Sequence, residues 1–131
     1  MKRVGLTILG YGRFGRVHAR RAQAHGAFDV ACVVDPDPHA RQAALADGFD
    51  AVAHVAQIPH GIEAAAIVTP AATHAALAIT LLHKGIDVLV EKPFATSEPD
   101  IDAMLCAEHA SGRTLCTAHI ERFNLALATP P

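Results

Sequence analysis

The chain has 131 residues, a formal net charge of −2, 51% hydrophobic residues and 18% charged residues. This length suits one domain with a real core, and the composition excludes a disordered chain. The weak net charge and the 5% aromatic content exclude a nucleic-acid surface, and the apolar runs are too short to cross a membrane.

Apolar runs alternate with helical patterns along the whole chain. The runs predict strands at 3–9, 28–34, 64–68, 86–90 and 114–118, with a short strand near 50–53. The segments between them predict helices at 13–25, 38–47, 70–84 and 98–111. This alternation indicates an α/β fold, a doubly wound parallel sheet with strand order 3-2-1-4-5-6. We expect one domain over residues 1–124 and a tail over 125–131, with Thr129 to Pro131 frayed.

Residues at the predicted element ends support this interpretation. Asp37 and Thr69 each precede a proline, so both are predicted to cap a helix that begins with that proline. Ser97 is predicted to cap the helix at 98–111. The near-continuous apolar strands, such as 30–34, suit a sheet buried on both faces. Helix ends are expected at Gly26, Gly85 and Gly112.

A glycine-rich stretch, Gly10-Tyr11-Gly12-Arg13-Phe14-Gly15, lies between the first predicted strand and the first predicted helix. Asp35 ends the next apolar run, 20 positions after Gly15 (35 − 15 = 20). Glycines in this context, with an acid at this spacing, form the dinucleotide-binding fingerprint of the Rossmann fold. Gly10 permits a sharp turn, Gly12 permits close approach of a pyrophosphate, and Gly15 permits tight helix packing. The unpaired amides of the helix N-terminus would then attract the diphosphate.

Asp35 predicts the type of dinucleotide. Its carboxylate would accept hydrogen bonds from an adenosine ribose and repel a 2′-phosphate, so we expect NAD rather than NADP. Arg13 could weaken that preference, because its guanidinium could reach a phosphate. The alternative is a glycine-rich turn without a ligand, which the agreement of position, spacing and acid disfavours.

Three later segments carry further chemistry: Val68 to His74, Val90-Glu91-Lys92-Pro93-Phe94, and His119 to Asn124. Each follows the carboxyl end of a predicted strand, the edge where open α/β sheets bind ligands. Together with the fingerprint, they resemble the Gfo/Idh/MocA oxidoreductase family, which includes glucose-fructose oxidoreductase and inositol dehydrogenase. The resemblance covers essentially the whole chain, and the ending is similar to members that act on nucleotide sugars.

The resemblance implies a role for each matching position. The fingerprint loop would hold the pyrophosphate, and Asp35 the adenosine ribose. His119 and Arg122 would line the opening on the substrate side, and Lys92 would reach toward the substrate hydroxyl as the catalytic residue. The implied cofactor-binding residues are Gly10, Gly12, Arg13, Phe14, Gly15, Asp35, Thr69, Pro70, His74, Glu91 and Lys92.

Chemistry gives Lys92 its own rationale. Oxidation of a sugar hydroxyl removes a proton as hydride leaves, and a nearby, partly desolvated lysine can stabilise the alkoxide and shuttle the proton. Glu91 could tune that lysine, although the two could also be a plain surface pair. His74 either lies near the cofactor or simply hydrogen-bonds its own loop.

The sequence departs from the family pattern after Asn124. Family members continue into an α+β substrate domain, which we expect to be absent from these residues, and Leu125 replaces a common proline. We therefore expect the NAD-binding domain of a sugar or nucleotide-sugar dehydrogenase, inactive without a substrate domain. The alternative is a stand-alone NAD(H)-binding sensor or assembly module. Asp35 disfavours a third hypothesis, a domain for another nucleotide such as coenzyme A.

Partners and compartment follow from the surface and the cysteines. The surface left without a second domain, and an edge strand at 114–118, predict a homo-oligomer or pairing with a separate substrate-domain chain. Cys32 and Cys116 are expected to fill the core. The odd cysteine count, without a signal peptide, predicts a reducing cytoplasm. The histidine spacings predict no metal site.

Overall fold

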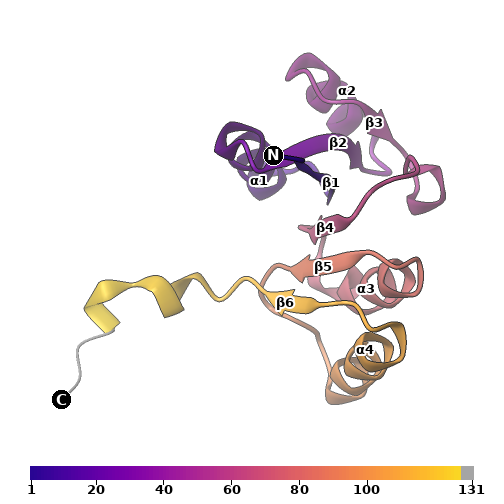
Figure 1. The fold of residues 1–131 in the computed structure, drawn as a ribbon, viewed down its shortest axis with the longest axis vertical. Helices are drawn as coiled ribbons and strands as arrows, with labels where there is room; N and C mark the ends of the chain where they lie inside the picture. Colours follow the sequence, from indigo (N-terminus) through magenta and orange to yellow (C-terminus); the bar gives the residue numbers. More distant parts are fainter. Residues whose placement is uncertain (128–131) are drawn as a thin grey trace.

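The computed structural model describes residues 1–127, and its six-stranded parallel sheet has the order β3-β2-β1-β4-β5-β6 (Figure 1). The predicted fold class and strand order are therefore confirmed. The strands are β1 (Val4–Leu9), β2 (Phe28–Val34), β3 (Ala51–Val52), β4 (Ala64–Ile67), β5 (Asp87–Val90) and β6 (Leu115–Thr117). The helices are α1 (Arg13–His25), α2 (Pro38–Ala46), α3 (His74–His83) and α4 (Glu98–Ser111), with short 3-10 turns at η1 (Val55–Gln57), η2 (Ala71–Thr73), η3 (Ile120–Phe123) and η4 (Leu125–Leu127).

Most helix ends lie where the capping residues predict them. The Asp37 carboxylate accepts the His39 amide at the start of α2, and the Ser97 hydroxyl accepts the Asp100 amide at the start of α4. Helices α1 and α4 end at Gly26 and Gly112, both in the left-handed conformation.

The start of α3 differs from the prediction. The segment after Pro70 first makes the 3-10 turn η2, so α3 begins four residues later than predicted, at His74. Thr69 does not cap this helix, because its hydroxyl pairs with the Thr73 hydroxyl at 2.6 Å. The Thr73 hydroxyl and amide both lie within hydrogen-bond distance of the Pro70 carbonyl, which closes the 3-10 turn.

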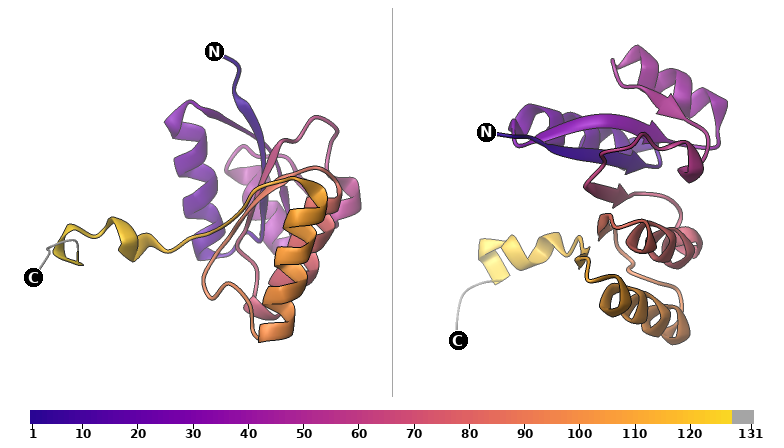
Figure 2. Two further views of the ribbon diagram at one scale, coloured as in Figure 1. Left: turned by 60° about the horizontal axis from the view of Figure 1, so that its bottom comes forward. Right: turned by 45° about the vertical axis from the view of Figure 1, so that its right-hand side comes forward.

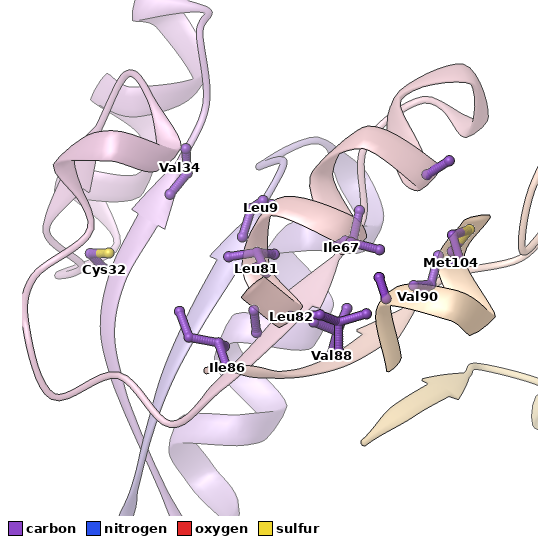
Figure 3. Packing of buried hydrophobic residues seen from close by; sticks show 14 residues of the cluster. Leu9, Cys32, Val34, Ile67, Leu81, Leu82, Ile86, Val88, Val90 and Met104 are labelled. Carbon is purple, nitrogen blue, oxygen red and sulfur yellow. The ribbon is translucent and has the colours of Figure 1, made fainter. Parts of the chain in front are cut away.

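One face of the sheet is fully packed. Helices α3 and α4 cover β4, β5 and β6 on this face, and Leu81, Leu82 and Met104 have no solvent exposure. Figure 3 shows the side chains of α3 and α4 meeting those of β1, β4 and β5 in one cluster. Cys32 lies in the same cluster, as predicted, and burial raises the pKa of its thiol.

The opposite face is packed only in part. Helices α1 and α2 cover β1, β2 and β3 there, but none of the described helices covers β4, β5 and β6 on this side. The result is a hollow of about 930 Å³, here called the sheet-face groove. Its floor includes Ile8, Ala66, Leu89 and Cys116, and α1 forms one wall.

The groove corrects two expectations from the sequence. Burial on both faces does not hold at β5 and β6 within the described residues, because Leu89 is partly exposed on the groove side and Cys116 is exposed there. Cys116 is exposed rather than a core residue, because it pairs with Leu89 in register and so lies on the uncovered face.

After β6 the chain runs away from the sheet, on the side opposite α3 and α4 (Figure 2). Its two short turns carry Phe123, Leu125 and Leu127, all strongly exposed. The predicted frayed end, Thr129 to Pro131, lies outside the described residues. None of the helices within residues 1–127 is long and apolar enough to cross a membrane.

Candidate functional site

The loop from β1 to α1 needs glycine at its two ends. Gly10 has φ +90°, and a Cβ there would meet the Val68 carbonyl oxygen at 2.6 Å. A Cβ on Gly15 would collide with the carbonyl oxygen of Gly10. Both glycines are therefore required by the fold itself, with or without a ligand.

Gly12 is different, because the fold does not need a glycine there. Its φ is −76°, and a Cβ would meet nothing within 4 Å. Within residues 1–127, the first amides of α1, at Arg13, Phe14 and Gly15, have no hydrogen-bond partner, and no side chain caps the helix. Open space before uncapped amides at a helix N-terminus suits a pyrophosphate. The missing side chain at Gly12 keeps that space free.

Asp35 lies beside this loop, as the fingerprint requires. It follows β2, which is next to β1, and its Oδ2 accepts the Tyr11 amide at 2.8 Å. Its Oδ1 accepts the Asp37 amide at 2.9 Å. These two bonds fix the carboxylate at the edge of the sheet and leave each oxygen able to accept a further bond from a ribose hydroxyl.

Tyr11 anchors the loop between β1 and α1 through its buried side chain, a role that the sequence alone did not indicate. Its ring is 3% exposed and packs edge-on against Phe49, with centroids 6.2 Å apart. Its hydroxyl donates to Asp47 at 2.8 Å, and Arg16 and Arg20 pair with the same carboxylate. Burial, followed by the bond to Asp47, raises the pKa of Tyr11 to about 12. The Tyr11 hydroxyl, with both arginines, lowers the pKa of Asp47.

Glu91 and Lys92 follow β5 at the same edge, but they do not pair with each other through their charges. Glu91 Oε1 lies 2.9 Å from His18 Nε2 of α1, and its Oε2 accepts the Lys92 amide at 2.9 Å. Among residues 1–127, the exposed Lys92 ammonium has no hydrogen bond or ion pair. The idea that Glu91 tunes the ammonium directly therefore gains no support from these contacts.

His74 is 1% exposed and lies between two loops. Its Nε2 is 2.8 Å from the Thr69 carbonyl, and its Nδ1 is 2.8 Å from the Pro93 carbonyl. Each ring nitrogen lies within hydrogen-bond distance of a carbonyl, and the tautomer decides which nitrogen donates. His74 thus ties the Thr69 loop to the Pro93 loop, and its contact with a cofactor stays a prediction.

The remaining predicted residues lie around the same edge. Phe14, at the start of α1, is 65% exposed. Phe14 and Thr69 both line the sheet-face groove. Arg13 is exposed and has no partner among the described residues. Pro70 is exposed beside Thr69. His119 and Arg122, after β6, are exposed too. The structure thus brings the fingerprint loop, Asp35, Thr69 and Glu91 to one edge and leaves their contacts with a cofactor as predictions.

The sequence and fold match a known family. Residues 4–119 match the model of GFO_IDH_MocA, described as an oxidoreductase family with an NAD-binding Rossmann fold. The chain belongs to this family. The open loop at Gly12 and the oriented Asp35 carboxylate fit NAD, the cofactor of this family's Rossmann domain.

Characterised relatives are similar over nearly the whole chain. UDP-N-acetylglucosamine 3-dehydrogenase of Acidithiobacillus ferrooxidans is 29% identical over 124 residues, covering 92% of this chain and 38% of the relative. GenD2 from gentamicin A biosynthesis, solved in complex with NAD, is 30% identical with a TM-score of 0.84, covering 90% of this chain and 35% of that one. The WlbA dehydrogenase from Bordetella pertussis, solved with NADH and UDP-GlcNAcA, is 28% identical with a TM-score of 0.83, covering 89% and 37%. The chain thus spans just over a third of the length of these relatives.

Proposed function

We propose that this family member is the NAD-binding part of a dehydrogenase that oxidises a hydroxyl group of a sugar or nucleotide sugar. The observation that carries the proposal is the exposed, unpaired Lys92 ammonium at the edge shared with the fingerprint loop. Relatives of about 30% identity that act on or bind UDP-linked amino sugars support this substrate class.

Lys92 would act on the oxygen of the substrate. Bound NAD would accept the hydride from the carbon that carries the hydroxyl. The Lys92 ammonium would stabilise the negative charge that develops on the oxygen, and in its neutral form the amine would take the hydroxyl proton. Glu91 and His74 would hold the backbone on either side of Lys92, through the Lys92 amide and the Pro93 carbonyl.

The same exposure argues that the chain by itself turns over no sugar. Lys92 lies in water, where an ammonium is weakly attracted to an alkoxide and water competes for the proton. A further protein surface would be needed to desolvate it. The second candidate, an NAD(H)-binding sensor or assembly module without catalysis, is favoured by this open arrangement.

We also propose that the sheet-face groove is covered in solution, either by a second copy of the chain or by a separate substrate-domain chain. The groove exposes apolar residues such as Leu89 and Cys116 on its floor, and monomers rarely leave a large apolar patch uncovered. Light scattering at high micromolar concentration should give a mass above that of one chain. A monomeric mass would exclude a second copy of the chain as the surface that covers the groove.

A cytoplasmic location remains our proposal. It rests on Cys32, Cys106 and Cys116, all of them free thiols. Fractionation of the producing cells checks it, and recovery in a secreted fraction would contradict it.

Calorimetric titration with NAD and NADP tests the cofactor role. We expect NAD to bind at least about tenfold more tightly, because the Asp35 carboxylate repels a 2′-phosphate. Gly12→Val should abolish binding and leave the fold intact, because the new side chain starts from a Cβ that meets no protein atom within 4 Å and enters the space meant for the pyrophosphate. Equal affinities would refute the role of Asp35, and NAD binding by the variant would refute the loop geometry.

Nicotinamide fluorescence with a panel of sugars should show no turnover.

A further inference from the structure

We infer that His18 is a positioning residue that holds the Glu91 carboxylate away from the Lys92 ammonium. The inference rests on the proposed function, in which Lys92 must stay free for the substrate. It concerns a histidine of α1 that the fingerprint does not include.

The geometry around Glu91 is specific. His18 Nε2 and Glu91 Oε1 are 2.9 Å apart, and their side chains are only 27% and 21% exposed. The two residues are 73 positions apart, so this contact joins α1 to the loop after β5. The second carboxylate oxygen is used by the Lys92 amide at 2.9 Å. Both oxygens of Glu91 are therefore engaged without the ammonium of its sequence neighbour.

Without His18, the nearest strong partner for Glu91 would change. One carboxylate oxygen would lose its partner in a half-buried position, which is unfavourable for a charged group. The adjacent Lys92 ammonium, which has no partner among residues 1–127, could satisfy it by rotating its flexible side chain. An ion pair formed in this way would withdraw the ammonium from the substrate.

His18 complements His74 on the other side of the same loop. His74 holds the Pro93 carbonyl, and His18 holds the Glu91 side chain. Lys92 lies between these two anchored residues, so its backbone is fixed while its side chain remains free. His18, Thr69, Glu91 and Lys92 all line the sheet-face groove. His18 thereby sets the direction in which Lys92 faces a ligand there.

Trace acetylation with acetic anhydride, read by mass spectrometry, tests this without any cofactor. Only the neutral amine reacts, and an ion pair with Glu91 would favour the ammonium form. In His18→Phe, which keeps a ring but has no nitrogen, the reactivity of Lys92 relative to exposed Lys84 should fall roughly fivefold. His18→Gln, which keeps a donor, should stay within about twofold of the wild type, as should the control His25→Leu on the same helix. If His18→Phe does not fold, His18→Leu replaces it.

A second variant isolates the carboxylate. Adding Glu91→Gln to His18→Phe should restore the reactivity of Lys92, because no charge is left to capture the ammonium. Unchanged Lys92 reactivity in a folded His18→Phe, or no restoration in the double variant, overturns the inference. Because no NAD is present, this outcome is independent of cofactor binding, whose failure would instead overturn the proposed function.

Discussion

The two faces of the sheet differ in how completely helices cover them. Under α3 and α4, strands β4 to β6 lie in a continuous core in which Leu81 and Met104 have no exposure. On the opposite face, α1 and α2 reach only β1 to β3, and Leu89 and Cys116 border an open groove.

This difference shows that an apolar sequence pattern in a strand does not by itself mean that both faces of the strand are buried. Strands β4 and β5 are apolar on both faces, with Ile67 and Val90 on one and Ala66 and Leu89 on the other. The first of these faces is fully buried in this domain, whereas on the second Ala66 is buried and Leu89 remains partly exposed. The second face has the apolar composition of a buried surface. We therefore propose that another protein surface covers it.

Substitutions on the two faces should have very different costs. Leu81→Ala removes a fully buried side chain from the covered face and should lower the free energy of unfolding by about 2–5 kcal/mol. Leu89→Ala, on the open face, should cost clearly less, because the residue is already partly exposed. Urea unfolding of both variants gives the comparison. Equal losses would mean that the groove is filled in the isolated domain.

The exposed cysteines test what covers the groove. Cys116 lies on its floor, and Cys106 lies on α4, away from it. If a second copy covers the groove, labelling of Cys116 by a maleimide should slow several-fold as protein concentration rises, and Cys106 should keep its rate. Cys116→Asp should abolish the concentration dependence of the mass in light scattering, whereas Cys106→Asp should not. Labelling of both thiols at constant rates would exclude association through this face.

Periodicity and local chemistry predict most of the fold. The bounds of α1 and α4 and the order of the strands follow from apolar runs, caps and glycines. Fingerprint spacing also places Asp35 beside the loop, since the ends of β1 and β2 are neighbours. The exposure of Cys116 is not readable in the same way, because the sequence shows that a strand is apolar and not whether a helix lies over it.

The contacts that organise the site are harder to foresee. Tyr11 with Asp47, and His18 with Glu91, join residues 36 and 73 positions apart. No local pattern specifies such pairs, because they depend on where the packing of α1 against β1 and β2 places its side chains. The start of α3 differs from the prediction for a local reason: the Thr69 and Thr73 hydroxyls pair with each other, so Thr69 does not cap the helix.

The smallest expected effect concerns Tyr11, which belongs to the core beneath α1 and α2. Its pKa is raised from 10.0 to about 12, so the folded state favours the neutral phenol. The resulting stabilisation is complete below pH 10 and is lost as the pH rises from 10 toward 12. Tyr11→Phe removes this dependence together with one hydrogen bond, at a cost of about 1 kcal/mol at neutral pH. Since the chain has a single tyrosine, the difference in unfolding free energy between wild type and variant isolates this phenol. Urea unfolding across that range should show the advantage of the wild type shrinking with pH, and a constant difference would show that Tyr11 ionises as freely in the folded chain as in the unfolded one.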